Sequence, residues 1–384
     1  MAYKALVVIG SLELGGTERH LCQIIPEING SEFEIEVVAF RKRGRLASEI
    51  EDKGVKVRSP QLPLWIERRR IFLTLAIFLW MGRLFLKERP HIVHTFLPEA
   101  YLIAGLWAAI LRIPVRIMSR RSLNDYQRKR RAFTHLEHWL HRYMHLLIGN
   151  SMSVANNLAC ETHDGTKRIR TIYNGIDVKP FVSSVSRNEM RSMLRVPNRA
   201  LLFCTVANLI PYKGHVDLLQ AFSHVAESLP SPWRWMCIGY GAEFEAYLKV
   251  LAEELGIGSE VMWLGSRSDI PELLTASDIG ILPSHEEGLP NAILEMMVSR
   301  LPVIATNVGG IPEIIVDQRT GMLVPPKQPK LLADAILALA RDPVLQSKMG
   351  EAGRVRVEKE FTLDSCLAEY RKVYSEVIQD QRRG

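Results

Sequence analysis

IGILPSHEEGLPNAILE, residues 279–295, has the pattern of a buried strand, a short loop and a helix. The apolar run 279–283 is typical of the strand, and Pro290 suits the first turn of the helix. Free backbone N–H groups at 288–291 would bind an anion, and Gly288 would let a ligand approach the backbone closely. Glu287 and Glu295 could accept hydrogen bonds from sugar or ribose hydroxyls. Alternatively, Glu287 is a solvated loop residue and Glu295 only a partner of the helix dipole.

The same unit of strand, loop and helix repeats along nearly the whole chain. In the second half we expect strands at 201–207, 234–239, 261–265, 279–283, 302–306 and 321–324. In the first half we expect them at 3–10, 33–40, 55–58, 91–96, 115–119, 146–151 and 168–173. Alternating strands and helices are typical of parallel sheets with helices on both faces. The sequence thus predicts an α/β fold with two Rossmann-like, doubly wound parallel-sheet domains.

The length of 384 residues accommodates two such domains. We expect them over 1–180 and 181–362, with a final helix over 363–384 that returns toward the first domain. An Asn-Gly turn and a polar stretch mark residues 174–199 as the linker region. Sheets of this kind bind ligands beyond the carboxyl ends of their strands. Two domains facing each other therefore predict a cleft that holds the chemistry.

The composition, with 47% apolar and 24% charged residues, excludes a disordered chain and a polytopic membrane protein. The longest uncharged apolar stretches, 71–82 and 100–111, have 12 residues each, whereas a bilayer-spanning helix needs about 20. Five widely spaced cysteines without a Cys-x-x-Cys pair predict neither a disulfide framework nor a zinc site. We therefore expect a cytoplasmic protein.

Charge is distributed unequally between the two halves. Residues 1–196 carry 31 Lys and Arg against 18 Asp and Glu, whereas residues 197–384 carry 18 against 24. A basic half suggests an anionic partner, such as a membrane surface, phosphates or nucleic acid. Trp65 and three consecutive arginines, Arg68, Arg69 and Arg70, precede the apolar run 71–81. This pattern predicts a helix on the inner face of the cell membrane, unless it is a core helix with a solvated arginine cluster.

Several ordered motifs resemble those of one enzyme family. Residues 287–295 resemble the Glu-x7-Glu signature of retaining GT-B glycosyltransferases of family 4, the glycosyl transferases group 1. LGGTER (14–19) resembles the family's amino-terminal glycine loop, and YKG (212–214) its phosphate-binding Lys-Gly. GYG (239–241), WLGS (263–266) and VGGIPE (308–313) follow in the family's order. The resemblance covers about residues 5–330.

The resemblance implies a GT-B fold with an acceptor-side first domain and a nucleotide-sugar-binding second domain. The implied reaction moves a sugar, with retention, from a nucleotide-diphosphate sugar to a glycan or lipid-linked glycan acceptor in polysaccharide or glycoconjugate biosynthesis. A nucleotide-sugar epimerase or phosphorylase on the same fold remains an alternative, and so does a non-catalytic membrane-surface binder. Nucleic acid is not expected as a partner.

Family roles can be attached to matching positions. Glu287 would hold donor sugar hydroxyls, Lys213 would neutralise the leaving diphosphate, and His94 would lie beside the transferred sugar at a strand end facing the cleft. A purely structural role for His94 is equally open, because Phe96 stands where relatives commonly have a second histidine. The remaining donor-binding positions are Gly15, Gly16, Asn208, Gly239, Ser266, Arg267, Gly288, Leu289 and Glu295.

Asn208 departs from the family pattern, which usually has Arg five residues before the lysine. Arg120 or Arg121, at a neighbouring strand end, could supply the missing cation for the phosphates, or contact the acceptor, or form a solvated pair. No cofactor and no metal are implied, because Lys213 and helix termini can balance the diphosphate and the chain contains no Asp-x-Asp.

Two further patterns give weaker signals for a cofactor or a metal. Residues 239–244 mimic a dinucleotide fingerprint, but Phe244 takes the place of its third glycine, so NAD binding is not expected. His135, His138, His141 and His145 have helical spacing. They could form a metal or acid-sensing patch, although a polar helix face is the favoured interpretation.

Overall fold

The computed structural model describes residues 2–63, 69–123, 131–162, 168–181 and 185–383. The chain divides into two compact units. Unit 1 consists of Met1–Gly175 with Leu363–Gly384, and unit 2 consists of Ile176–Thr362. The division between them comes a few residues before the expected position at 180, and the last helix belongs to unit 1.

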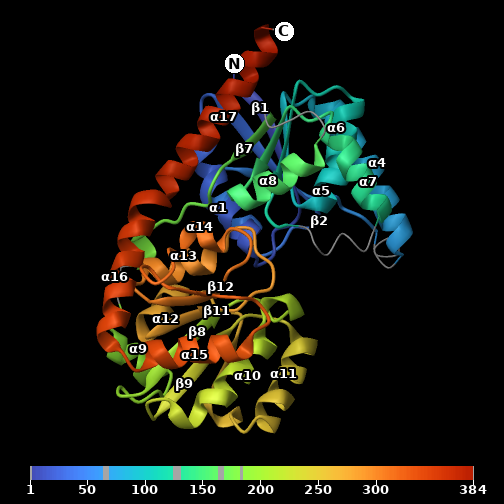
Figure 1. Ribbon diagram of the computed structural model, residues 1–384. Coiled ribbons are helices and arrows are strands. Elements are labelled where there is room, and N and C mark those ends of the chain that lie inside the picture. Colours follow the sequence, from blue (N-terminus) through green and yellow to red (C-terminus); the bar gives the residue numbers. More distant parts are fainter. Residues whose placement is uncertain (1, 64–68, 124–130, 163–167, 182–184, 384) are drawn as a thin grey trace. The chain divides into compact units, whose positions relative to one another are not determined.

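Unit 1 contains a seven-stranded parallel sheet with the order β3-β2-β1-β4-β5-β6-β7 (Figure 1). Its strands are β1 (Tyr3–Ser11), β2 (Phe33–Lys42), β3 (Lys56–Arg58), β4 (Ile92–Phe96), β5 (Val115–Arg120), β6 (Leu146–Gly149) and β7 (Ile169–Thr171). Side chains alternate across β1, so that Val7 and Ile9 face one layer of helices and Leu6 and Val8 face the other. This double burial explains why the strand is apolar at every position from 5 to 9.

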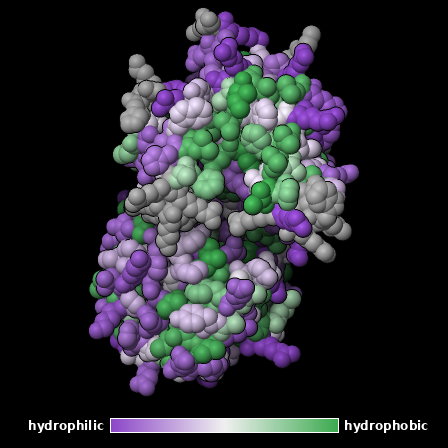
Figure 2. All heavy atoms as spheres, turned by 90° about the vertical axis from the view of Figure 1, so that its right-hand side faces the viewer, coloured by the Kyte–Doolittle hydropathy of each residue, from purple (hydrophilic) through white to green (hydrophobic). Residues whose placement is uncertain are grey.

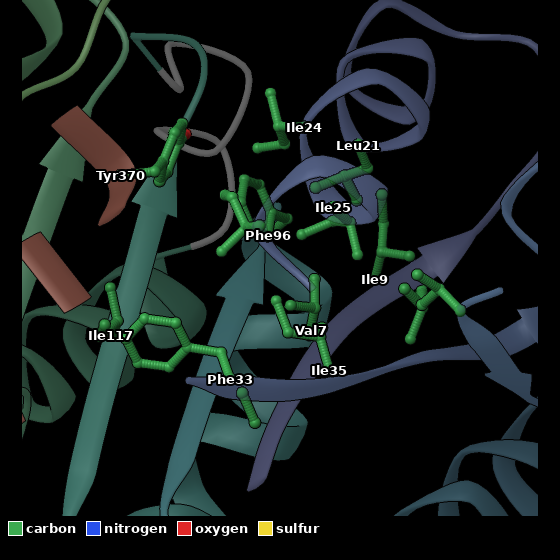
Figure 3. Packing of buried hydrophobic residues seen from close by; sticks show 14 of the residues in the cluster. Val7, Ile9, Leu21, Ile24, Ile25, Phe33, Ile35, Phe96, Ile117 and Tyr370 are labelled. Atoms are coloured by element: carbon green, nitrogen blue, oxygen red, sulfur yellow. The ribbon is translucent and has the colours of Figure 1, made fainter. Parts of the chain in front are cut away.

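Helices cover both faces of this sheet. One face is packed by α1 (Gly16–Ile28), α2 (Leu46–Asp52) and the last helix α17 (Leu363–Arg383). Figure 3 shows Leu21, Ile24 and Ile25 of α1 and Tyr370 of α17 among the apolar side chains of this core. The other face carries α4 (Arg70–Glu88), α5 (Pro98–Ala100), the π-helical turn η1 (Tyr101–Gly105), α6 (Leu106–Ile110), α7 (Arg131–His141) and α8 (Met152–Glu161).

Unit 2 contains a six-stranded parallel sheet with the order β10-β9-β8-β11-β12-β13. The strands are β8 (Leu201–Val206), β9 (Trp233–Ile238), β10 (Val261–Gly265), β11 (Ile279–Leu282), β12 (Val303–Thr306) and β13 (Met322–Val324). The helices are α9 (Arg187–Met193), α10 (His215–Val225), α11 (Ala242–Glu254), α12 (Ile270–Ala276), α13 (Asn291–Val298), α14 (Ile311–Ile314), α15 (Pro329–Ala340) and α16 (Pro343–Glu360). Single 3₁₀ turns occur at η4 (Lys179–Phe181), η5 (Pro211–Lys213), η6 (Ala226–Ser228) and η7 (Gly258–Glu260).

All thirteen predicted strands are present, with ends within two residues of the expected positions. The linker prediction for 174–199 is wrong in part, because α9 lies within it. The guanidinium of Arg191 on α9 is fully buried, donates to the carbonyl oxygen of Ala276 and pairs with Asp278 at 2.7 Å. These contacts attach α9 to unit 2. Among the described helices, none is long and apolar enough to cross a membrane.

Candidate active site

The predicted donor-binding residues of unit 2 follow four neighbouring parallel strands. Asn208 and Lys213 follow β8, Gly239 follows β9, Arg267 follows β10 and Glu287 follows β11. Because the strands are parallel and adjacent, their carboxyl ends lie at one edge of the sheet. The loops that leave this edge form the candidate active site.

Lys213 and Glu287 form an ion pair at this edge. Lys213 lies in the turn η5, and its Nζ donates to Oε1 of Glu287 at 2.6 Å. The two side chains are only 18% and 9% exposed. Burial is the largest influence and would lower the pKa of Lys213, but Glu287, together with Tyr212 and Glu286, outweighs it, so the pKa is raised. Lys213 therefore carries a positive charge at neutral pH.

Two hydroxyl side chains support Glu287. The buried Ser284 donates from Oγ to the same Oε1 at 2.7 Å. Thr306, the last residue of β12, donates a hydrogen bond to the carbonyl oxygen of Ser284. Ser284 stood within the predicted motif but had no assigned role, because the sequence does not reveal where a loop hydroxyl points.

Glycines on both sides bring the neighbouring loops against residues 283–288. Gly214 has φ +74°, and a Cβ there would collide with the carbonyl oxygen of Pro283. Gly309 has φ +54°, and a Cβ there would collide with the carbonyl oxygen of Glu287. The backbone N–H of His285 donates to the carbonyl oxygen of Tyr212 at 2.7 Å. The loop of Glu287 is therefore clamped between the loops that follow β8 and β12.

The imidazole of His285 adds a contact to this clamp. Its Nε2 lies 2.7 Å from Oδ2 of Asp217 in the first turn of α10. His215, also in the first turn, is buried with no hydrogen-bond partner on its ring nitrogens among the described residues. Burial and, to a smaller extent, Lys213 lower the pKa of His215 to about 4. It is therefore neutral at pH 7.

The other predicted donor residues of unit 2 lie in the loops and on the helix that follow the strands at this edge. Gly288 accepts a backbone hydrogen bond from Gly310 at 2.8 Å, and Leu289 is buried. Pro290 is the N-cap of α13 rather than its first residue, and Glu295 lies half-buried on this helix. Asn208 and Ser266 are exposed, and a Cβ at Gly239 would collide with the carbonyl oxygen of Ala207. Arg267 pairs with Asp269, with Nε 2.8 Å from Oδ1.

In unit 1, the predicted glycine loop forms the N-terminus of α1. Gly15 is the N-cap and Gly16 the first residue, which is exposed. A Cβ at Gly16 would meet no atom within 4 Å, so packing does not require glycine there. Glu18 lies in the first turn, where burial raises the pKa of its carboxyl group.

His94 lies inside the sheet rather than at the cleft-facing strand end where it was predicted. Its neighbours in register are Val7 of β1 and Ile117 of β5, and the side chain is fully buried. Nδ1 lies 2.7 Å from the hydroxyl of Tyr374, and Nε2 lies 2.8 Å from Oγ of Ser119. Burial lowers the pKa of His94 to about 3, with a smaller contribution from Arg121. With both nitrogens occupied, His94 holds α17 against the sheet.

Arg120 and Arg121 have different surroundings, although they are adjacent. Arg120, at the end of β5, is buried and pairs with Glu137 of α7 and with Glu161 of α8 at 2.7 Å. The prediction that it could contact phosphate or acceptor is therefore wrong. Arg121 is half-buried, donates to the Tyr370 hydroxyl and lies near Glu18. Burial lowers the pKa of Arg121.

The four histidines do not form one helix face, because α7 ends at His141. Nδ1 of His145 instead accepts the backbone N–H of Arg116 at 3.1 Å. His141, Glu137 and Glu161 have ligand atoms within 4.8 Å of one another, a spacing that could hold a metal ion. The guanidinium of Arg120 contacts both carboxylates, however, so these residues form a buried ion-pair cluster.

Two family descriptions match the chain. "Glycosyltransferase Family 4" matches residues 14–179, and "Glycosyl transferases group 1" matches residues 186–356. The chain belongs to the group 1 glycosyltransferases. These enzymes are of class EC 2.4.

The glycosyltransferase has relatives with assigned reactions. It is 29% identical over 235 residues to N-acetyl-α-D-glucosaminyl L-malate synthase of Bacillus anthracis, a match over 60% of this chain and 61% of that protein. It is 22% identical over 371 residues to UDP-Gal:α-D-GlcNAc-diphosphoundecaprenol α-1,3-galactosyltransferase of Escherichia coli, 95% of either chain. One relative is named a synthase and the other a galactosyltransferase, and neither supports the epimerase or phosphorylase alternative.

Solved structures share the fold of this glycosyltransferase. HepE of Anabaena in complex with UDP-glucose matches with a TM-score of 0.84 at 20% identity, over 97% of this chain and 99% of that chain. WaaG, a glycosyltransferase involved in lipopolysaccharide biosynthesis, matches with a TM-score of 0.77 at 15% identity, over 96% and 99%. The two parallel sheets are those of a GT-B fold.

Proposed function

We propose that the protein transfers a sugar, with retention, from a nucleotide-diphosphate sugar to an anionic glycan or lipid-linked acceptor. The observation that carries this proposal is the buried pair of Lys213 and Glu287, with Glu295 on the following helix, at the ligand-binding edge of a parallel sheet. The pair presents a positive charge beside a carboxylate. The positive charge can bind a diphosphate, and the carboxylate can accept hydrogen bonds from sugar hydroxyls.

In the proposed mechanism Lys213 stabilises the charge that develops on the leaving diphosphate. Glu287 accepts hydrogen bonds from the sugar, and Glu295 accepts them from the ribose. The acceptor attacks on the side of the leaving group, so the diphosphate itself takes the acceptor proton and no protein nucleophile is needed. Lys213 and the N–H groups at helix termini balance the diphosphate, so the reaction proceeds without a metal ion.

Arg121 is the proposed contact for an anionic acceptor in unit 1. Arg120 is neutralised by two glutamates, whereas Arg121 is half-buried beside the N-terminus of α1. The names of both relatives include an anionic acceptor, which is malate in one and a lipid diphosphate in the other. A guanidinium suits either anion because it donates two parallel hydrogen bonds.

The acceptor-side unit also exposes apolar residues that favour a membrane surface as its location. One face of α4 is buried through Ile77, Met81 and Phe85. Its other face exposes Ile71, Phe72, Leu75 and Leu79, and nearby helices expose Ile110, Phe133 and Trp139. Figure 2 shows apolar side chains gathered on this side of unit 1. Trp65, Arg68 and the side chain of Arg70 lie outside the described residues, but Arg69 and Arg83 are exposed beside the apolar face.

A thermal-shift panel tests the proposed donor. UDP, GDP and ADP, each with a matching nucleotide sugar, are added to the full chain, and ligand at 100 times its Kd stabilises by about 2.7 kcal/mol. We expect one base to raise the Tm. Incubation of that nucleotide sugar without acceptor, followed by NMR, should yield no new epimer. No stabilisation by any pair, or a new epimer, would contradict the proposal.

A further inference from the structure

We propose that Ser284 is a positioning residue whose hydroxyl holds the Glu287 carboxylate so that Oε2 is the oxygen presented to the donor sugar. This inference rests on the proposed function, in which Glu287 binds sugar hydroxyls. It adds a residue to which neither the sequence motifs nor the relatives assign a role.

The two carboxylate oxygens of Glu287 have different surroundings. Oε1 accepts from Nζ of Lys213 at 2.6 Å and from Oγ of Ser284 at 2.7 Å. Those two donors match the two lone pairs of one carboxylate oxygen. Among the residues that the structure describes, no hydrogen bond reaches Oε2. The remaining capacity of Glu287 to accept a sugar hydroxyl is therefore on Oε2.

Ser284 is better suited than Lys213 to keep this orientation when the donor binds. A lysine side chain is flexible and carries three N–H donors, so an arriving diphosphate can draw Lys213 away from Glu287. Ser284 has no such freedom, because it is fully buried and Thr306 donates to its carbonyl oxygen. The adjoining backbone is fixed by the hydrogen bond from His285 to Tyr212. The hydroxyl thus stays in place while the charge distribution around Glu287 changes.

Binding of two ligands that differ only in the sugar tests the inference. The probes are the nucleoside diphosphate and nucleotide sugar of the base that stabilises the wild type in the panel, for example UDP and UDP-glucose. In Ser284→Ala we expect the Kd of the nucleotide sugar to rise about tenfold, the scale of a hydrogen bond to a charged group. The Kd of the nucleoside diphosphate should change less than about twofold, because Ser284 acts only through the carboxylate that binds the sugar.

Two further variants separate positioning from packing. Ser284→Thr keeps the hydroxyl and should restore the wild-type ratio of the two affinities, even if the added methyl group lowers the Tm. Ser277→Ala removes another buried hydroxyl of unit 2, which donates to the carbonyl oxygen of Leu273 at 2.9 Å. It should lower the Tm about as much as Ser284→Ala does and leave both Kd values unchanged.

The possible outcomes are distinct. If Ser284→Ala weakens both ligands equally, or neither, Ser284 does not position Glu287 and the inference is wrong while the proposed function stands. The proposed function fails, and this inference with it, in either of two cases. One is that Glu287→Gln leaves the ratio of the two affinities unchanged. The other is that the wild type binds none of the nucleoside diphosphates and nucleotide sugars in the panel.

Discussion

Single residues at the edge of the second sheet decide the proposed chemistry. Lys213→Ala should lower kcat/KM at least about 100-fold, since removing one electrostatic contact to a transition state typically costs on the order of 3 kcal/mol. Glu287→Ala should have an effect of the same size. The measurement is initial-rate kinetics with the donor identified by the panel.

The matched control for the lysine is Lys249→Ala, which removes an exposed lysine that pairs with Glu245 on the surface of α11. Surface pairs of this kind contribute little, so its kcat/KM should stay within about twofold of the wild type. Normal turnover by Lys213→Ala with an unchanged Tm would show that the assigned mechanism is wrong.

The proposed contact of Arg121 with an anionic acceptor can be tested through acceptor affinity. Arg121→Gln should raise the KM for an anionic acceptor by about tenfold or more, the expected loss of a charge-assisted hydrogen bond. The Kd of the nucleoside diphosphate should not change. Arg116→Gln is the control, because the Arg116 guanidinium donates to the backbone carbonyl oxygens of Tyr143 and Ile113 in the same unit. A higher Kd for the nucleoside diphosphate with an unchanged acceptor KM would instead show that Arg121 contacts the donor.

At the scale of elements, the glycine clamp around residues 283–288 makes a separate prediction. Gly309→Ala should lower kcat/KM by about 100-fold and reduce the Tm, because the new Cβ would push against the backbone of Glu287 at a positive φ. Gly54→Ala is the control, since Gly54 also has positive φ (+82°) but no atom within 4 Å of a Cβ. Its Tm should fall by about 2–4 °C and its kinetics should be unchanged. Equal kinetics in both variants would mean that the clamp does not position Glu287.

Sequence patterns predicted the strands but not the surroundings of two side chains. The strands were predictable because both faces of each sheet are buried, and continuous apolar runs such as 5–9 and 279–282 identify them. The resemblance assigned Lys213 and Glu287 to the same donor site, and both follow parallel strands that end at one edge, but their ion pair was not predicted. His94 was misplaced because a histidine two residues before a strand end can point into the core, where Tyr374 and Ser119, remote in sequence, bind it. Arg120 was misplaced because its partners lie on two later helices.

For the whole molecule, buried histidines predict how stability depends on pH. Burial lowers the pKa of His94 to about 3 and those of His145 and His215 to about 4, from an ordinary value of 6.5. Between about pH 6.5 and 4 the unfolded chain therefore binds protons that the folded chain does not, so stability falls as the pH is lowered through this window. Glu161, with a pKa lowered to about 2, keeps its stabilising charge there.

Urea unfolding of the full chain at pH 7, 6 and 5 measures this dependence. His94→Gln should reduce the slope of unfolding free energy against pH by about 1.4 kcal/mol per pH unit, the contribution of one proton. His135→Gln is the control, because His135 is exposed on α7. An unchanged slope in His94→Gln would mean that this histidine is protonated in the folded protein.

The last prediction concerns the attachment of the whole protein to a lipid surface. The exposed apolar face of α4, with Ile71 83% and Leu79 58% exposed, lies beside Arg69 and Arg83. Apolar insertion and about 1 kcal/mol per basic residue should together give weak, salt-sensitive binding to anionic vesicles. Leu75→Ser with Leu79→Ser should reduce recovery in co-sedimentation with phosphatidylglycerol vesicles, and Arg69→Glu with Arg83→Glu should reduce it further at low salt. Leu331→Ser with Val344→Ser, which alters two exposed apolar residues of unit 2, should have no effect. Equal recovery on neutral and anionic vesicles, or none on either, would contradict this attachment and favour a soluble acceptor.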